Sequence, residues 1–84
     1  MTTPTEEYIT SDYYISTALL ASNENLIGHK KDETGKLIWI FEERESLTVV
    51  VQNYYNGNLV LPLSDVFQAQ RLLKNQIKQS KSLT

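Results

Sequence analysis

The stretch Leu37–Gly57, LIWIFEERESLTVVVQNYYNG, decides the fold, because it joins the densest apolar run of the chain to its clearest structural boundaries. Its first part, Leu37–Phe41, has apolar residues on both faces of an extended chain. This pattern is typical of a strand that is covered on both faces or that lies at the centre of a small sheet. The charged run Glu42–Glu45 then ends the strand.

The second part of the stretch has the period of an amphipathic helix. From Leu47 the apolar residues recur at positions 47, 50, 51, 54 and 55, which lie on one side of a helix. The β-branched run Val49–Val51 opposes a helix by about 1 kcal/mol, but burial of the apolar side should exceed this cost several-fold. We therefore expect a helix with Ser46 as its N-cap, ended by Asn56-Gly57, where glycine adopts the left-handed conformation.

The residues before this stretch predict one helix and one further strand. A helix over residues 11–22 has Tyr14, Ile15, Ala18 and Leu19 on one side, with Thr10 or Ser11 as its N-cap. A short strand is expected to start at Tyr8-Ile9.

A β-hairpin is predicted between the two helices. Residues 26–31 and 36–41 form its strands, and the loop 32–35 contains Gly35, which supplies the positive φ that such a loop needs. Simple alternation places Leu26, Gly28 and Lys30 on one face of the first strand.

The end of the chain predicts a short edge strand and a third helix. Residues 58–61 form the strand, which Pro62 ends because it has no N–H to donate. The helix starts at the N-cap Ser64 and runs to about Gln79. Its apolar stripe consists of Val66, Phe67, Ala69, Leu73 and Ile77.

These elements predict an α+β fold in the order α-β-β-α-β-α. A small antiparallel hairpin or three-stranded sheet is packed by three helices. We expect one domain over residues 8–79, preceded by a flexible lead at 1–7 and followed by a polar tail at 80–84. A chain of 84 residues has a modest core, so a function must use a surface or a shallow groove.

Composition narrows the class of protein. The absence of cysteine excludes a disulfide framework and a thiolate nucleophile, and it favours a reducing compartment. No apolar run approaches the ~18 residues of a membrane span, and no basic and apolar leader opens the chain, so we expect a cytoplasmic protein without membrane contact. The net charge is −2, but residues 1–45 carry −5 and residues 46–84 carry +3.

The sequence offers little for catalysis or for a metal. His29 is the only histidine and has no metal-ligand motif around it, so we expect no metal and no cofactor. Glu42, Glu43 and Glu45 follow a strand, where charged runs are usually solvated. Glu42 is expected to accept a hydrogen bond from the hydroxyl of Tyr54 or Tyr55. We predict that the chain is not an enzyme.

Two tyrosine pairs, at 13–14 and 54–55, point to a contact surface. In each pair one ring can enter the core while the other stays exposed, and exposed tyrosines give contact area at low entropic cost. We expect Tyr13, Val49 and Tyr55 to be protein-binding residues. The alternative is that the outer rings only cover the surface of the fold.

The third helix carries the one charge pattern with a defined geometry. Arg71, Lys74, Lys78 and Lys81 are spaced by 3, 4 and 3 residues, so they project from one side of a helix. Such a row can follow a phosphate backbone or meet an acidic protein surface. Cations near a helix C-terminus also complement the helix dipole without any partner.

The chain resembles a group of small uncharacterised domains of bacteria and of phages or other mobile elements. The resemblance covers residues 8–78, with signatures of the forms TSDxY, FE and YYNG. The residues that carry it are Tyr8-Ile9-Thr10-Ser11-Asp12 with Tyr14, Leu26-Ile27-Gly28, Trp39-Ile40-Phe41-Glu42, Tyr54-Tyr55-Asn56-Gly57, Phe67 and Leu73-Lys74. It implies a compact α+β fold and a mobile-element origin, and it brings no catalytic or ligand residue. The second helix departs from this pattern, because Thr48, Val49 and Gln52 occupy its outer side, which is rich in glutamate in the family.

Taken together, these observations predict a non-enzymatic protein-interaction module encoded by a phage or mobile element. An antagonist of a host defence or regulatory complex is one concrete version. The alternative is a small nucleic-acid-binding accessory protein that uses the basic face of the C-terminal helix. The sequence is also compatible with a homodimer, because Val49 is an apolar residue on an otherwise polar side of the helix.

Overall fold

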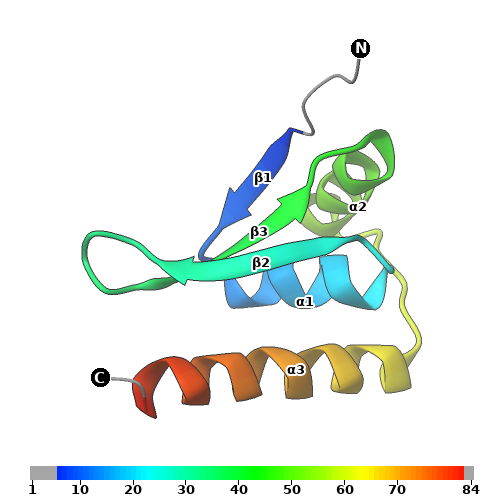
Figure 1. Ribbon diagram of the computed structural model, residues 1–84. Coiled ribbons are helices and arrows are strands. Elements are labelled where there is room, and N and C mark those ends of the chain that lie inside the picture. The colour runs from blue at the N-terminus through cyan, green and yellow to red at the C-terminus, as the bar shows by residue number, and fades with distance from the viewer. Residues whose placement is uncertain (1–5, 83–84) are drawn as a thin grey trace.

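The computed structural model describes residues 6–82, with side chains described as far as Ser80. The elements, shown in Figure 1, are β1 (Glu7–Thr10), α1 (Tyr13–Ala21), β2 (Leu26–Lys31), β3 (Leu37–Glu42), α2 (Glu45–Asn56) and α3 (Leu63–Ser82). The predicted α+β class, with a three-stranded antiparallel sheet and three helices, is confirmed. The order along the chain is β-α-β-β-α-α. The predicted order is wrong because it takes the third strand from residues 58–61, whereas the structure forms it from Glu7–Thr10.

The third strand is β1, and residues 58–61 form no strand. The in-out alternation of this segment is real, because Leu59 and Leu61 are half-buried and Val60 is 89% exposed. The two leucines face the helices instead of pairing with the sheet, and the Asn58 N–H donates to the Asn53 carbonyl at 2.9 Å. The alternating pattern of residues 58–61 therefore correctly indicated that one side of this segment is buried. It did not show whether the segment pairs with the sheet through hydrogen bonds.

The strand order is β1-β3-β2, so β3 is the central strand, as one reading of Leu37–Phe41 predicted. Both neighbours are antiparallel to it: Tyr8 pairs with Phe41, and His29 pairs with Trp39. The side chains of Trp39 and Phe41 point to the helical side and are buried. The sheet thus presents one covered face and one open face.

Strand β2 contains a bulge that overturns the predicted alternation. Leu26 pairs with Phe41 and Gly28 pairs with Ile40, so two steps along β2 match one step along β3. Ile27 is the extra residue. Leu26 therefore faces the core while Gly28 and Lys30 face the opposite side, whereas simple alternation placed all three together.

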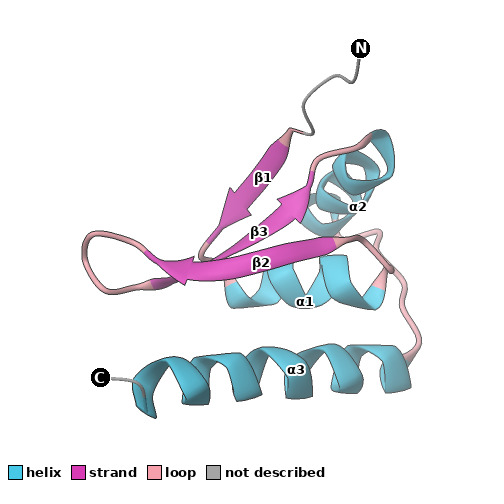
Figure 2. Cartoon of the chain, viewed as in Figure 1, coloured by secondary structure: helices cyan, strands magenta, loops and turns pink. Residues whose placement is uncertain are grey.

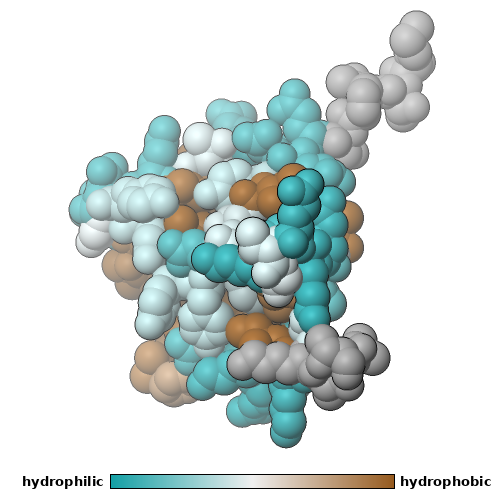
Figure 3. All heavy atoms as spheres, turned by 90° about the vertical axis from the view of Figure 1, so that its left-hand side faces the viewer, coloured by the Kyte–Doolittle hydropathy of each residue, from teal (hydrophilic) through white to brown (hydrophobic). Residues whose placement is uncertain are grey.

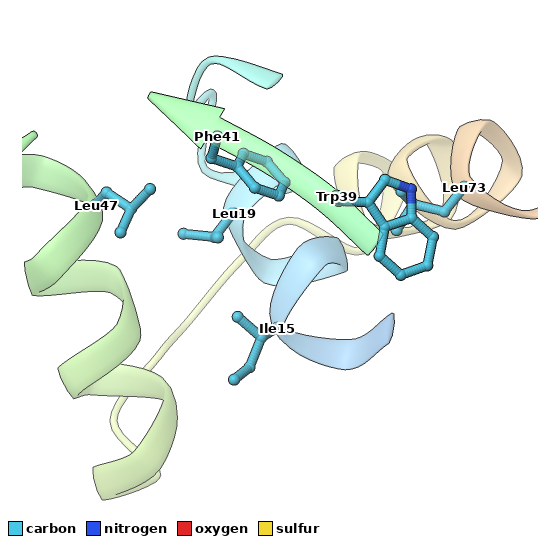
Figure 4. Close-up of a cluster of buried hydrophobic side chains, with 6 residues drawn as sticks. All are labelled: Ile15, Leu19, Trp39, Phe41, Leu47 and Leu73. Atoms are coloured by element: carbon cyan, nitrogen blue, oxygen red, sulfur yellow. The ribbon is translucent and has the colours of Figure 1, made fainter. Parts of the chain in front are cut away.

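The core lies between one face of the sheet and all three helices. Figure 4 shows its larger buried apolar residues, which are Ile15, Leu19, Trp39, Phe41, Leu47 and Leu73. Helix α1 contacts both α2 and α3, so it is the central helix of the helical layer. No helix covers the other face of the sheet in the described part of the chain (Figures 1 and 2).

The helix boundaries correct the predicted caps. The Asp12 carboxylate caps α1 by accepting from the N–H groups of Tyr14 and Ile15, so neither Thr10 nor Ser11 is the cap. Helix α2 begins one residue before Ser46, and its N-cap, Arg44, makes no side-chain capping bond. Its end is as predicted, with Gly57 at φ 74°.

Helix α3 is longer than expected. It begins at Leu63, so Ser64 lies inside its first turn, and it runs to Ser82, through part of the predicted tail. Ala69 and Leu73 are buried as predicted, but Phe67 is exposed. Most of the predicted flexible lead, residues 1–7, lies outside the described residues. Its last residue, Glu7, is described and already belongs to β1. None of the helices described is long and apolar enough to cross a membrane.

Candidate functional site

A shallow apolar hollow of about 340 Å³ lies where the three helices meet the segment between α2 and α3. Its lining residues are Tyr14, Thr17, Ala18, Tyr54, Gly57, Leu59, Leu61, Val66 and Gln70. They come from α1, from the end of α2, from the connecting segment and from the first half of α3. The hollow exists because the connecting segment packs its leucines inward without pairing with a strand.

The two tyrosine pairs supply the aromatic part of this hollow. Tyr14 is 66% exposed and stands edge to face against Tyr13, with ring centroids 5.5 Å apart. Tyr54 is half-buried and stands edge to face against Tyr55 at 5.3 Å. Each pair thus has one inner and one outer ring, as predicted, and one ring of each pair, Tyr14 and Tyr54, faces the hollow.

A stripe of exposed side chains runs along α3 beside the hollow. Its described members are Leu63, Phe67, Arg71, Lys74 and Lys78. Their spacing of 4, 4, 3 and 4 residues keeps them on one side of a helix. The first two are apolar and the next three are cationic, so the stripe changes character along its length. We call this set the α3 stripe.

The hollow and the α3 stripe form one continuous surface. Gln70 lines the hollow, and it also lines a second depression with Phe67, Arg71, Lys74 and Asn75. An apolar cavity therefore adjoins exposed apolar and cationic groups. We call the hollow and the stripe together the groove surface.

The predicted cations are placed as expected where the structure describes them. Arg71, Lys74 and Lys78 are exposed on one side of α3. Lys81 lies within the helix, but its side chain falls outside the described part. Within the described residues, Arg44 is the only cation in an ion pair, so the three α3 cations have no carboxylate partner of their own.

The predicted protein-binding residues do not come together. Tyr13 is half-buried and packs against the core, and its hydroxyl is buried, so it is not the exposed ring of its pair. Val49 and Tyr55 are both exposed on α2. Their separation of six residues turns them about 120° apart around the helix. None of the three lines the hollow.

Burial and neighbouring groups raise the pKa values of two tyrosine hydroxyls, those of Tyr8 and Tyr13. Burial, followed by Tyr55, Asp12 and Glu43, raises the pKa of the Tyr8 hydroxyl. Tyr55 does not line the hollow that Tyr54 lines. Burial, followed by Tyr14, raises the pKa of Tyr13. Both phenols are therefore neutral near pH 7.

The hairpin brings a second basic group to the end of α3. His29, Lys30 and Lys31 line a depression of about 340 Å³ together with Gln79 and Ser80. Figure 3 looks onto this end of the molecule, and the surface is mostly hydrophilic with apolar residues in small separate groups. The hairpin lysines therefore extend the basic character of the last turns of α3.

The acidic candidates have structural partners. Glu42 accepts from the Asn25 amide at 3.4 Å and lies 3.8 Å from Arg44, so its predicted bond to Tyr54 or Tyr55 is wrong. Arg44 also donates to Glu24 at 3.1 Å. In the part of the chain that is described, no three His, Asp or Glu side chains gather in a group able to hold a metal ion.

Sequence reasoning missed several lining residues of the hollow for an identifiable reason. The sequence predicts Leu59 and Leu61 in a short strand, which would pair them with the sheet. Their Leu-Val-Leu alternation before Pro62 was a signal of one buried side, which is compatible with a loop packed on helices. A tyrosine pair does not show which ring turns inward, so the sequence did not reveal that Tyr14, and not Tyr13, is the exposed ring of the first pair.

Comparisons with known proteins add no relative. No protein-family model matches the chain, and neither the curated proteins nor the solved structures compared with it contain a match. The resemblance to small domains of mobile elements therefore stays a prediction.

Proposed function

We propose that this chain is a non-enzymatic protein-interaction module whose binding site is the groove surface. The observation that carries the proposal is the junction of an apolar hollow with a row of cations on α3, Arg71, Lys74 and Lys78, that form no ion pair within the described residues. An antagonist of a host defence or regulatory complex remains one concrete form of this function, and it rests on the sequence resemblance.

The size of the hollow favours an anchoring side chain over a whole ligand. Its volume of about 340 Å³ is at the lower end of the ~300–1,000 Å³ of ligand pockets. It is open and accommodates one or two large apolar side chains. Burial of one such side chain contributes about 1.5–3 kcal/mol, which is enough for a recognisable anchor.

The cations define the chemistry of the partner. An exposed ion pair contributes only about 0–1 kcal/mol, so Arg71 and Lys74 add orientation and association rate more than affinity. The partner that fits is a segment with an aromatic or aliphatic anchor followed by carboxylates about one to three helical turns away. An amphipathic acidic helix has this arrangement.

The test is affinity purification from the native host with matched variants. Tyr14→Ala removes an exposed ring from the hollow, and Arg71→Glu with Lys74→Glu reverses the charge of the α3 stripe. Tyr55→Ala is the matched control, because that ring is 69% exposed and lies outside the hollow. We expect one partner to be retained by the wild type and by Tyr55→Ala, and lost by the other two variants.

The opposite pattern contradicts the proposal. Loss of the partner with Tyr55→Ala and retention with Tyr14→Ala would move the contact to the outer side of α2. Circular dichroism of each variant shows whether the fold persists, and all the altered side chains are exposed.

A nucleic-acid ligand is the second candidate, and the hairpin lysines favour it. Lys31 and the end of α3 line one depression, so cations of two elements lie at the same end of the molecule. A mobility shift with single-stranded and duplex DNA or RNA tests this candidate. Nucleic-acid binding predicts an affinity that falls steeply with salt and is weakened by Lys31→Glu as well as by Arg71→Glu. A shift that is indifferent to both changes removes the candidate.

A further inference from the structure

The open face of the sheet carries isoleucines that no helix of the described chain covers, of which Ile9 and Ile27 are exposed and Ile38 and Ile40 are half-buried. Ile9 is 51% exposed and pairs with Ile40, and alternation along β3 places Ile38 on the same side. Ile27, the extra residue of the bulge, is 48% exposed. None of the four belongs to the core or to the side chains packed against it.

Charges of opposite sign lie at the two ends of this face. At one end Glu7 pairs with Glu42. Toward the other end Lys30 pairs with Ile38, and Lys36 lies two residues before Ile38. The register positions of Glu7 and Lys30 are four residues apart along β3, or about 13 Å. Glu42 is partly engaged by Arg44 and Asn25, so Glu7 is the carboxylate available at its end.

We propose that two copies of the chain associate face to face through the isoleucine face, defined as Ile9, Ile27, Ile38 and Ile40. In a twofold dimer the same surface meets itself, so the surface must be complementary to its own turned image. Turning one copy end for end places the acidic end over the basic end of the other. The isoleucines then pack as the inner faces of two sheets do.

The sheet edges favour stacking of faces over pairing of strands. Strand β2 has a bulge and the lysines Lys30 and Lys31, which are features that keep an edge from pairing with another chain. Strand β1 has only four residues, so it offers few hydrogen bonds to a partner strand. The face of the sheet is the larger uncovered surface.

The size of the face sets the strength of the dimer. Strands of four, six and six residues, spaced by ~4.8 Å, cover roughly 250 Å², against about 800 Å² per partner in a standard interface. The dimer is therefore weak and reversible. Sedimentation equilibrium at high protein concentration is the measurement that detects such a dimer.

The first experiment removes the apolar contact. Ile9→Thr with Ile40→Thr keeps β-branched residues in the strands but makes the face polar. We expect the average mass of this variant to stay at that of the monomer over the concentration range in which the wild type dimerises. Val49→Thr is the control, because Val49 is a comparably exposed apolar residue on α2, and it should leave dimerisation unchanged.

The second experiment tests the orientation. Glu7→Lys alone and Lys30→Glu alone should each weaken self-association by about tenfold, because like charges then face each other. Mixing the two variants restores opposite charges at both ends, so a heterodimer should form with near wild-type affinity.

Three results would overturn the proposal. The wild type remains monomeric at millimolar concentration, Val49→Thr abolishes the dimer while the isoleucine variant retains it, or the mixture of charge variants shows no recovery. Each variant alters exposed or half-exposed positions, and circular dichroism checks that its fold is kept. None of these residues lines the hollow, so the outcome is independent of the proposed protein-binding function.

Discussion

At the scale of single residues, two neighbouring hydroxyls in α1 differ in a way that stability measurements can detect. Ser16 is fully buried and its hydroxyl has no hydrogen-bond partner, whereas the Thr17 hydroxyl donates to the Tyr13 carbonyl at 2.8 Å. An unpaired buried hydroxyl costs about 1–3 kcal/mol, and alanine is the better helix former. We expect Ser16→Ala to raise the free energy of unfolding in urea by about 1 kcal/mol.

Thr17→Ala is the matched comparison. It removes a formed hydrogen bond one position along the same helix and should lower the free energy of unfolding by about 0.5–1.5 kcal/mol. Equal losses for the two variants would show that the Ser16 hydroxyl has a partner in solution.

Asp32 gives a residue-scale prediction for pH. Its carboxylate accepts from the Thr34 hydroxyl at 2.6 Å and from the backbone N–H groups of Lys36 and Thr34, and these bonds lower its pKa below the usual value. A lowered pKa in the folded state stabilises the hairpin above the ordinary pKa of aspartate, about 3.9, and this stabilisation is lost as pH falls through the folded pKa.

The Thr34 hydroxyl is the first cause of the lowered pKa, so its removal is the test. Thr34→Val should raise the pKa of Asp32 toward its ordinary value in an NMR titration of the side-chain carboxyl. Thr48→Val, which alters an exposed threonine on α2, should leave it unchanged. A pKa that does not respond to Thr34→Val would assign the shift to the backbone N–H groups alone.

At the scale of elements, one side-chain hydrogen bond joins α3 to the centre of the sheet. The Trp39 indole N–H donates to the Gln76 side-chain carbonyl at 2.8 Å, and Trp39 is almost fully buried. In Gln76→Leu the buried indole N–H loses its acceptor, which costs about 1–3 kcal/mol. Trp39 is the only tryptophan, so its fluorescence reports both the local change and global unfolding.

The comparison for this prediction is Gln68→Leu, an exposed glutamine of the same helix. It should change the free energy of unfolding by less than about 0.5 kcal/mol. A similar loss in both variants would mean that the cost comes from added apolar surface on α3 and not from the indole.

At the scale of the whole molecule, the sequence correctly predicted features that depend on the local periodicity of apolar residues. It did not predict features that depend on contacts between residues far apart in the chain. The α2 helix was correct because Leu47 is buried and Val50, Val51 and Tyr54 pack against the core, which outweighs the cost of the β-branched valines, whereas Tyr55 of the same predicted side is exposed. The third strand was misplaced because Tyr8-Ile9 and 58–61 both alternate, and only tertiary packing chooses which of them pairs with β3. The hollow was missed for the same reason, since Leu59 and Leu61 line it only after three helices have assembled.

Arg44 provides the prediction at this largest scale, because it connects parts of the chain about twenty residues apart. It donates to the buried carboxylate of Glu24 at 3.1 Å and to the Asn23 carbonyl at 3.2 Å, which joins the α1–β2 turn to the start of α2. Arg44→Ala leaves the Glu24 carboxylate buried without its cation. Because the Arg44 side chain is itself 45% exposed and water can enter, we expect a loss of about 1–3 kcal/mol in the free energy of unfolding, at the lower end for buried pairs.

The double variant separates the ion pair from the burial of a lone charge. Glu24→Gln with Arg44→Ala removes both charges and should recover part of the stability lost in Arg44→Ala, because the buried group is then neutral. Urea unfolding followed by Trp39 fluorescence measures all three proteins. A double variant less stable than Arg44→Ala would show that Glu24 is stabilised by groups other than Arg44, and the joint between the turn and α2 would then not depend on this pair.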